Sequence, residues 1–344
     1  MKNWLESESE NEDMVLSSRI RLARNIKSIP FPNKLIEEDA KNIVKKVEDA
    51  FYSSNSIEEK YKTIYLWQND DVSNKVYFER HLISKKLISN QKEAAFIVNN
   101  DETVSIMINE EDHIRLQSIT GGLNLKEAYE FCNKLDDLLE KNLDYAFDEK
   151  LGYLTSCPTN LGTGLRASVM VHLPALTMNR EIVGLLNGLT QVGMTVRGLY
   201  GEGSQGEGNL YQISNQITLG LSEEEILSNL TGIINQVVNQ EKIARERIFK
   251  NSKYELEDKI YRAAGILKSA VILSSKETLK LLSDVRLGVE MGIIKDIDKN
   301  ALNKLLIEIQ PAVIQKSSKD KLLSKQIDLT RAQLVRRKLK VMNL

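Results

Sequence analysis

Three strand-like segments follow one another closely in the first half of this 344-residue chain. Residues 94–100 and 103–109 are rich in apolar and β-branched residues and are separated by an Asn-Asp-Glu turn, and residues 113–119 continue the pattern. Parallel strands need a connection of a dozen or more residues, so strands this close together pair antiparallel. The sequence therefore predicts an α+β fold with a largely antiparallel sheet flanked by helices.

Further elements fit this fold class. Strands are expected at residues 14–20, 63–68, 167–172 and 210–219, and helices at residues 125–144 and 174–190. The second of these helices opens with a proline, which suits a first turn. A longer helix is expected to begin at Ser222, whose partner in a capping box is Glu225, and to continue to about Phe249.

The composition changes near residue 250. Residues 251–344 hold three of the eighteen glycines and no tryptophan, phenylalanine or cysteine. Apolar residues recur there at helical spacing, as in Leu256, Ile260, Ala263, Leu267 and Val271. The sequence predicts two domains, residues 1–250 and 251–344, and the second is expected to be entirely helical.

Charge and cysteine content narrow the functional classes. Lys and Arg total 47 against 48 Asp and Glu, so no overall basic field draws the chain to nucleic acid or to an anionic membrane. Two cysteines argue against a disulfide framework, and no apolar run has membrane-spanning length. The first residues are acidic, unlike a signal peptide, so we expect a cytoplasmic protein. Three histidines without a Cys-x-x-Cys or His-Glu-x-x-His motif argue against a built-in metal site.

Five arginines accompany strand-like or glycine-rich segments: Arg19, Arg21, Arg115, Arg166 and Arg197. Each guanidinium can grip phosphate oxygens at two points, so together they could clamp a triphosphate. The chain has no P-loop motif and no protein-kinase motif set, which leaves arginine as the cation for this task. The alternative is that these are surface arginines in scattered salt bridges.

Three motifs carry a family resemblance. They are Asn109-Glu-Glu-Asp-His-Ile-Arg115, Cys157-Pro-Thr-Asn-Leu-Gly-Thr-Gly-Leu-Arg-Ala167 and Val196-Arg-Gly-Leu-Tyr-Gly-Glu202. With the arginines near the start of the chain, they resemble the catalytic domain of the phosphagen (guanidino) kinases over residues 14–250.

The resemblance implies a role for each matched residue. The five arginines would contact the phosphates of ATP, Glu111 and Glu202 would hold the substrate guanidinium, and Cys157 would be the reactive thiol. Further nucleotide-binding positions are implied at Ser17, Ser18, Ile20, His81, Ala167, Ser168, Val169, Met170 and Gly198.

The chemistry of the residues agrees with that assignment. A guanidinium is protonated at neutral pH and becomes a nucleophile only when a proton leaves. Two carboxylates can orient its planar fork and accept that proton, and we expect Glu111 to be the base and Glu202 the orienter or a second base. Cys157 as a thiolate would favour the cationic substrate, although a buried, inert thiol is the alternative. Magnesium is expected to arrive with ATP, since no acidic cage is visible.

Two departures indicate a subclass. The small-molecule guanidino kinases carry a helical domain before the first arginine motif, whereas here that motif begins at Ser17. The helical domain after residue 250 has no counterpart in those enzymes. Both features resemble the bacterial protein arginine kinases. The resemblance implies ATP-dependent phosphorylation of arginine in proteins, with the helical domain used for regulation and dimerisation.

The resemblance also implies partners. These are a homodimer mate, a heat-shock repressor as target, a zinc-binding activator protein and a Clp-type ATPase that receives phosphoarginine-marked clients. Two alternatives stay open. One is a kinase for free arginine or another small guanidino compound, and the other is a non-catalytic adaptor that binds phosphoarginine.

Three positions depart from the pattern or have a second interpretation. Met170 stands where the metabolic kinases usually carry histidine near adenine, although methionine can pack on a purine. His81 is either an adenine or phosphate contact or a structural residue. In protein arginine kinases a pocket with the motif Arg-Asp-x-x-Arg-Ala senses phosphoarginine.

The corresponding segment of this chain is Ile327-Asp-Leu-Thr-Arg-Ala332. Asp328, Arg331 and Ala332 match the motif, and one phosphate contact is lost at Ile327. The basic run 331–340 is expected to be the solvated face of a terminal helix.

Overall fold

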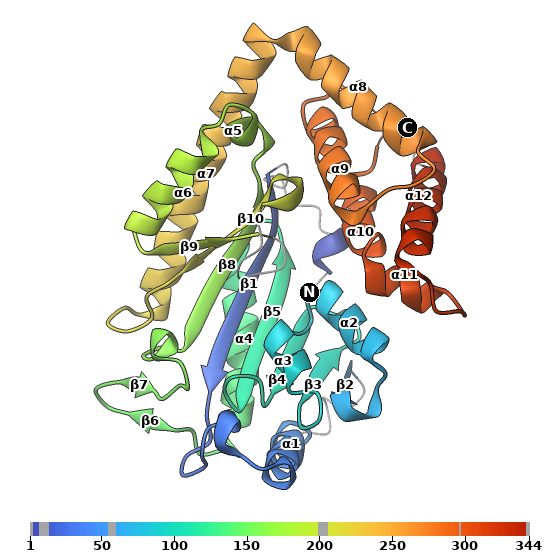
Figure 1. The fold of residues 1–344 in the computed structure, drawn as a ribbon. Coiled ribbons are helices and arrows are strands. Elements are labelled where there is room, and N and C mark those ends of the chain that lie inside the picture. The colour runs from blue at the N-terminus through green and yellow to red at the C-terminus, as the bar shows by residue number, and fades with distance from the viewer. Residues whose placement is uncertain (1–2, 7–13, 54–59, 199–205, 296, 342–344) are drawn as a thin grey trace. The chain divides into compact units, whose positions relative to one another are not determined.

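The computed structural model describes residues 3–6, 14–53, 60–198, 206–295 and 297–341. Its main element is an eight-stranded sheet of order β2-β3-β4-β5-β1-β8-β10-β9 (Figure 1). The strands are β1 (Val15–Arg24), β2 (Tyr61–Tyr65), β3 (Ala95–Asn99), β4 (Val104–Ile108), β5 (Ile114–Gly121), β8 (Leu165–His172), β9 (Met194–Arg197) and β10 (Leu210–Asn215). A separate hairpin joins β6 (Phe147–Asp148) to β7 (Gly152–Tyr153).

The helices lie between the strands and in a long C-terminal series. They are α1 (Glu37–Phe51), α2 (Asp71–Glu79), α3 (Lys85–Ser89), α4 (Leu125–Glu140), α5 (Pro174–Met178), α6 (Ile182–Gln191), α7 (Glu223–Asn251), α8 (Lys253–Ser269), α9 (Ser275–Glu290), α10 (Lys299–Glu308), α11 (Pro311–Ser317) and α12 (Ser324–Val341). Short 3-10 turns include η4 (Leu66–Gln68), η5 (Pro158–Asn160) and η6 (Glu207–Asn209).

The antiparallel prediction is confirmed. Strand β3 pairs antiparallel with β2 and with β4, and β5 pairs antiparallel with β4 and with β1. Two predicted strands were too long at their C-terminal ends. The chain turns into η4 after Tyr65, and β10 ends at Asn215.

The chain divides into two compact units. The first comprises Met1–Trp4, Ser17–Val169 and Ser214–Gly232, and the second comprises Leu5–Leu16, Met170–Ile213 and Ile233–Leu344. The division passes through β1, β8, β10 and α7. The domain boundary expected near residue 250 stays a prediction.

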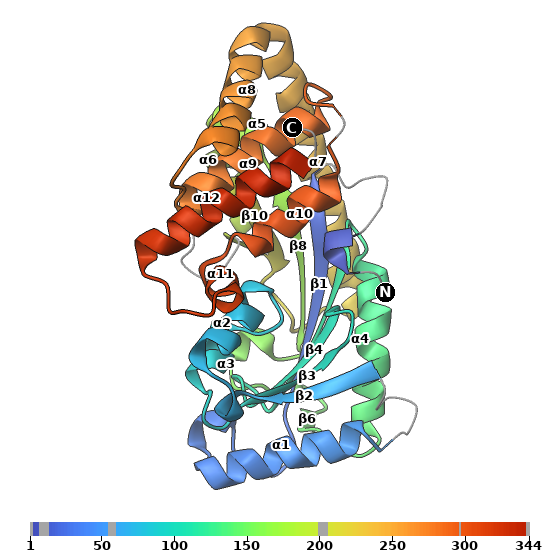
Figure 2. The same cartoon turned by 90° about the vertical axis from the view of Figure 1, so that its right-hand side faces the viewer.

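In the first unit, β1 separates a buried face from a partly exposed one. Ile20 and Leu22 are buried, whereas the alternate residues Arg19 and Arg21 are partly exposed. Ser18, on the buried face, donates a hydrogen bond to the Gly122 carbonyl oxygen at 2.7 Å. Helix α4 packs on β5, and α1 contacts α4 and β4 (Figure 2).

In the second unit, α8 packs against α9 and α12. Four of the five apolar positions predicted for this helix are buried, but Val271 is 65% exposed. The prediction was wrong there because α8 ends at Ser269.

The helix expected over residues 174–190 is two helices, α5 and α6. Arg180 lies between them with φ of 61°, a left-handed backbone conformation that an α-helix does not contain. The capping box at the start of α7 is confirmed. The Ser222 N–H donates to the Glu225 carboxylate at 2.7 Å, and the Glu225 N–H donates to Ser222 Oγ at 3.2 Å.

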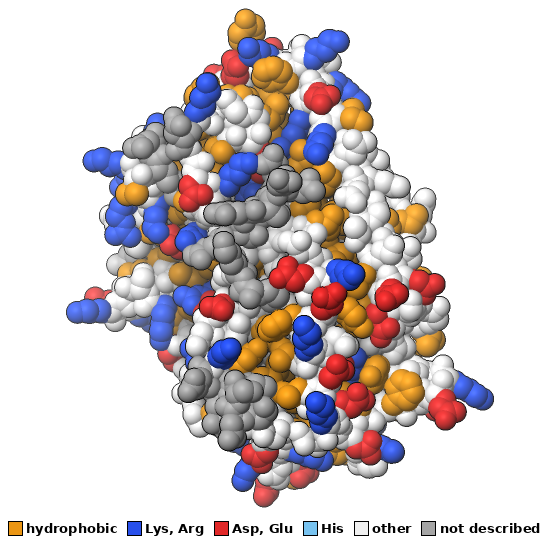
Figure 3. All heavy atoms as spheres, turned by 180° about the vertical axis from the view of Figure 1, so that it is seen from behind, with side chains coloured by type: hydrophobic (Ala, Val, Ile, Leu, Met, Phe, Trp, Pro, Cys, Tyr) orange, Lys and Arg blue, Asp and Glu red, His pale blue; other side chains and the backbone are white. Residues whose placement is uncertain are grey.

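The surface carries charges of both signs. On the face seen in Figure 3, basic and acidic side chains are interspersed, in keeping with their near-equal totals of 47 and 48. Within the described residues, no helix combines the length and the apolar character that a membrane span requires.

Candidate active site

Four of the predicted arginines meet on one face of the sheet. Arg19 and Arg21 alternate on β1, and Arg115 of β5 lies on their face because its partner across the ladder is Ala23. Arg19 Nε donates to Ser168 Oγ on β8 at 3.4 Å, and Arg166 is two residues from Ser168 on that strand. Three adjacent strands thus supply four guanidinium groups, Arg19, Arg21, Arg115 and Arg166, which we call the arginine face.

Arg21 is repelled by more charged groups on the arginine face than attract it. The pKa of Arg21 is lowered well below its ordinary value, first by burial and then by repulsion from Arg115, Arg19 and Arg166, while Glu110 acts in the opposite direction. Arg21 Nε is buried and has no hydrogen-bond partner among the described residues. An unbalanced group of cations of this kind is stabilised by a polyanion.

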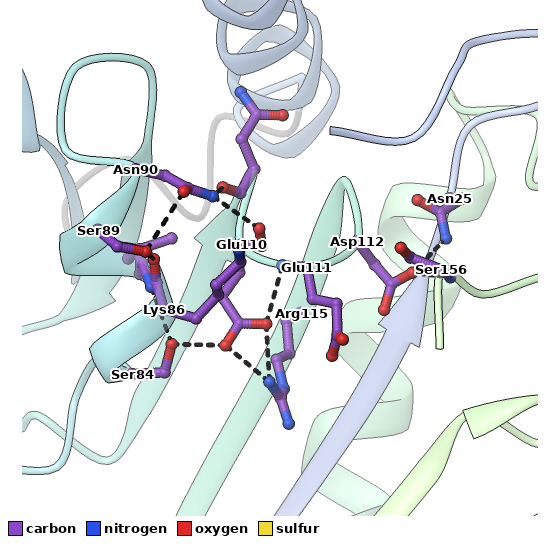
Figure 4. A network of polar contacts seen from close by, with 12 residues as sticks. Asn25, Ser84, Lys86, Ser89, Asn90, Glu110, Glu111, Asp112, Arg115 and Ser156 are labelled. Carbon is purple, nitrogen blue, oxygen red and sulfur yellow. Dashed lines mark hydrogen bonds and ion pairs between the residues drawn. The ribbon is translucent and has the colours of Figure 1, made fainter. Parts of the chain in front are cut away.

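Glu110 partly compensates that charge. Arg115 Nη1 donates to both of its carboxylate oxygens, at 2.8 and 2.7 Å, and Ser84 Oγ donates to Oε1 (Figure 4). Burial by itself would raise the pKa of Glu110, but Arg115 and these hydrogen bonds outweigh it and the pKa is lowered. Glu110 is therefore an ionised partner that holds Arg115 in place.

Glu111, the predicted base, is in a different environment. It is half-buried, and its pKa is raised, first by burial and then by repulsion from Glu110, against attraction from Arg115. A carboxylate with a raised pKa accepts a proton more readily near neutral pH, so this side chain suits general-base chemistry.

A tight turn presents Glu111. Asn109 has a left-handed backbone with φ of 60°, and its Nδ2 donates to the carbonyl oxygens of Ala40 and Glu93 at 2.8 and 2.9 Å. His113 Nδ1 accepts from the Ile26 N–H at 3.1 Å, so its Nε2 carries the proton and donates to Pro30 at 2.9 Å. Burial lowers the pKa of His113, which keeps this ring neutral and structural.

Cys157 lies on a segment tied to that turn. It is partly exposed, and its Sγ lies 3.0 Å from Thr159 Oγ1. The preceding residue, Ser156, donates its N–H to Asp112 Oδ1 at 2.6 Å. Asp112 directly follows Glu111, so the predicted base and the predicted thiol lie on two segments joined by a hydrogen bond. The other cysteine, Cys132, is buried as a core residue, as predicted.

His81 lies beside the arginine face. It is partly exposed and has a left-handed backbone conformation with φ of 62°, and its carbonyl oxygen accepts a hydrogen bond from Gln117 at 2.8 Å. Its pKa is lowered to about 3, first by burial and then by Arg19. A neutral imidazole ring has one nitrogen that donates and one that accepts a hydrogen bond. The predicted nucleotide contact stays a prediction.

The other predicted nucleotide residues are spread over two faces and two units. Ser17 lies on the arginine-face side of β1, whereas Ser18 and Ile20 lie on its buried side. Ala167 and Val169 are fully buried on β8.

Three predicted nucleotide residues belong to the second unit. Met170 packs against its helical core, Arg197 ends β9, and Gly198 follows it. The second predicted carboxylate, Glu202, lies outside the described residues.

Two of the three predicted phosphoarginine-sensing residues, Arg331 and Ala332, are buried in the second unit, and Asp328 is partly exposed. Arg331 is 1% exposed and donates to the carbonyl oxygens of Ile309 and Leu273 at 2.7 and 2.8 Å, and it pairs with Asp328. Ala332 is fully buried. Arg331 therefore joins α12 to neighbouring segments, and the prediction of a solvated face over residues 331–340 is wrong at this residue.

Sequence reasoning missed four residues that shape the site: Asn25, Ser84, Glu110 and Asp112. Glu110 and Asp112 flank Glu111, and their position in one acidic run was a usable signal. Asn25 and Ser84 gave no signal, because their partners are distant in sequence. Among the described residues, no group of three or more His, Cys, Asp or Glu side chains could hold a metal ion.

Comparison with known proteins agrees with this geometry. Residues 42–244 match the family model described as "ATP:guanido phosphotransferase, C-terminal catalytic domain". That match covers more than half of the chain, and the chain belongs to the ATP:guanido phosphotransferase family. Residues 253–344 match a second model, "Protein-arginine kinase McsB C-terminal domain".

Relatives at high identity extend over the whole chain. The "Protein-arginine kinase" of Clostridium kluyveri is 63% identical over 99% of both chains, and that of Clostridium acetobutylicum is 57% identical over 99% of this chain and 100% of the relative. Among solved structures, lombricine kinase matches with a TM-score of 0.58 and 26% identity, over 70% of this chain and 71% of the other. The resemblance inferred from the motifs is confirmed.

Proposed function

We propose that this protein is an ATP-dependent protein arginine kinase, which transfers the γ-phosphoryl group of ATP to the guanidinium of arginine residues in proteins. The observation that carries the proposal is the arginine face, where Arg21 is repelled by the three other arginines and a half-buried acid with a raised pKa, Glu111, is attracted by Arg115. Phosphoryl transfer depends on neutralising and aligning phosphate oxygens, and this arrangement suits that task.

Each group has a role in the proposed reaction. Arg19, Arg21, Arg115 and Arg166, together with Arg197, bind the phosphates, and Mg²⁺ is held through phosphate oxygens and water. A guanidinium nitrogen of the acceptor attacks the γ-phosphorus as the bond to the β–γ bridging oxygen breaks and ADP leaves. Glu111 takes the proton from that nitrogen. Glu202 is the proposed second carboxylate, and Cys157 is a further contact for the acceptor.

The remaining nucleotide contacts are proposed from the family resemblance. They are Ser17, Ser18, Ile20, His81, Ala167, Ser168, Val169, Met170 and Gly198. The buried Arg331 presents no free cationic surface, so phosphoarginine sensing by the segment 327–332 is not part of the proposed function.

Identity of 57–63% to protein-arginine kinases over the full chain supports a protein acceptor rather than free arginine. The matched C-terminal domain supports the same choice. We extend the proposal to a cytoplasmic homodimer that acts in stress response. Its proposed partners are a heat-shock repressor, a zinc-binding activator protein and a Clp-type ATPase that receives the marked clients.

Incubation with MgATP and either an unfolded arginine-containing protein or free arginine tests the proposal. Mass spectrometry under conditions that preserve acid-labile phosphoarginine is expected to find the modification on the protein. Rapid phosphorylation of free arginine with none on protein would establish the small-molecule alternative. Binding of a phosphoarginine peptide without any turnover would establish the adaptor alternative.

A further inference from the structure

Asp112 joins the two segments that carry Glu111 and Cys157. Its Oδ1 accepts hydrogen bonds from the Ser156 N–H at 2.6 Å and from Asn25 Nδ2 at 2.7 Å, and the residue is 2% exposed. Asp112 directly follows Glu111, and Ser156 directly precedes Cys157. Figure 4 shows Glu111, Asp112 and Ser156. A partly buried hydrogen bond therefore joins the two segments directly.

Asn25 completes the link from a third segment, the residue after β1. Its Oδ1 accepts from the His113 N–H at 2.9 Å, and its Nδ2 also donates to the Leu154 carbonyl oxygen at 3.0 Å. The turn, the thiol segment and the end of β1 thus share one network. A buried acceptor oxygen that serves two donors is not readily replaced by water, so this link depends on the side chain of Asp112.

Asp112 also places a negative charge beside Glu111. Repulsion from Asp112 raises the pKa of Glu111, in addition to the larger effects of burial and of Glu110. The same side chain therefore acts on the predicted base through charge and on the thiol segment through a hydrogen bond.

We propose that Asp112 is a positioning residue of the phosphoryl-transfer site, which holds the Cys157 segment in register with Glu111 and adds a negative charge beside that base. The catalytic part rests on the proposed function. The part that concerns the spacing of the two segments does not rest on the proposed function. This spacing can be tested even in a protein that has no kinase activity.

Two substitutions separate the hydrogen bonds from the charge. Asp112→Ala removes both, whereas Asp112→Asn keeps an acceptor oxygen for Ser156 and Asn25 but removes the charge. A matched control is Asp148→Ala, which removes an exposed carboxylate that accepts from two backbone N–H groups, those of Lys150 and Leu151.

In turnover assays, Asp112→Ala is expected to lower kcat about 100-fold, because misplacing a reacting group costs that much, with little change in KM for MgATP. Asp112→Asn is expected to retain more of kcat and to move the acidic limb of the kcat/KM profile to lower pH, since loss of the charge lowers the pKa of Glu111. The control is expected to behave like wild type. If the acidic limb of the kcat/KM profile of Asp112→Asn lies at the same pH as in wild type, the proposed role of the Asp112 charge is overturned.

Alkylation of Cys157 by iodoacetamide needs no turnover. Cys132 is buried, so the native protein reports on Cys157 alone. Asp112→Ala is expected to raise the alkylation rate severalfold, because the segment is released, whereas Asp112→Asn stays close to wild type. An unchanged rate in a folded Asp112→Ala protein overturns the proposal. If wild type phosphorylates no protein, the proposed function fails, while the alkylation rates still decide whether Asp112 holds the segment.

Discussion

The arginine face of the first unit and an ion network in the second unit both hold buried charge, but they balance it differently. On the arginine face, Arg21 is repelled by three other arginines and attracted by one acid, Glu110. In the second unit, Glu290 pairs with Arg286 at 2.6 Å and with Arg245 at 2.9 Å, and Arg245 pairs with Glu241 at 2.9 Å.

The network in the second unit is closed by further polar contacts. Glu241 accepts from the N–H groups of Ala175 and Leu176, each at 3.0 Å, and His172 Nε2 lies 2.8 Å from Ser283 Oγ. Burial would raise the pKa of Glu290, but Arg286, His172 and Arg245 outweigh it and lower the pKa to about 2. This carboxylate is ionised at neutral pH and forms ion pairs with two arginines, Arg245 and Arg286.

The difference separates a structural use of charge from a functional one. Buried charges that are paired fix the packing of the helices they join. Removing one member of a pair leaves the other charge buried without a counter-charge, which is strongly destabilising. Cations that repel one another cost stability in the free protein, and such perturbed charges gather at functional sites. Four predictions test this contrast.

The largest expected effect is on turnover. Arg21→Met removes a proposed phosphate contact and is expected to lower kcat/KM for MgATP about 1,000-fold, in the range measured for catalytic arginines in phosphoryl transfer. The variant should be at least as stable as wild type, because a repelled cation is lost. The control is Arg247→Met, which removes an exposed arginine that pairs with Glu181. Steady-state kinetics and urea unfolding check both, and a destabilised Arg21→Met would contradict the contrast.

Glu290→Gln should show the opposite pattern. It leaves Arg245 and Arg286 without their shared acid and is expected to lower the free energy of unfolding by about 3 kcal/mol, as found when one partner of a buried pair is removed. Urea denaturation measures the loss. A neutral effect would mean that the network contributes little to the stability of the second unit.

The third prediction concerns pH. The pKa of His172 is lowered from 6.5 to about 4, first by burial, so the unfolded chain binds a proton that the folded chain does not. The free energy of unfolding should therefore fall as pH falls from 6.5 to about 4, by up to about 1.4 kcal/mol per pH unit. His172→Gln should reduce that slope, as measured by urea denaturation at several pH values. The pKa of Glu290 is lowered from 4.5 to about 2, so its contribution to the free energy of unfolding is lost at lower pH, as the pH falls from 4.5 to about 2.

The smallest effect is expected at Ser84. Its hydroxyl donates to Glu110 and accepts from the Leu87 N–H at 3.0 Å as the N-cap of α3. Ser84→Ala should lower the free energy of unfolding by about 1 kcal/mol, typical of a lost cap. Thermal unfolding checks it. The control is Ser89→Ala, which removes a hydroxyl that donates to the Lys86 carbonyl oxygen on the exposed side of α3. A similar loss of unfolding free energy in this control would show that Ser84 has no special role.

The sequence predicted the fold class and the arginine face better than the details around them. Period-two alternation placed Arg19 and Arg21 on one side of a strand, and that side is the partly exposed one. The break at Arg180 was missed because a left-handed residue other than glycine has no compositional sign. The burial of Arg331 was missed because its acceptors are carbonyl groups on segments far away in sequence.

The central claim is that a phosphate-binding arginine face and a nearby proton acceptor, Glu111, act together. The most direct test measures MgATP affinity by calorimetry and phosphoarginine by mass spectrometry for Glu111→Gln and wild type. We predict equal nucleotide affinity and a loss of phosphoarginine of about 1,000-fold, within the range of general-base contributions. Phosphoarginine formed by Glu111→Gln at the wild-type rate would contradict the account.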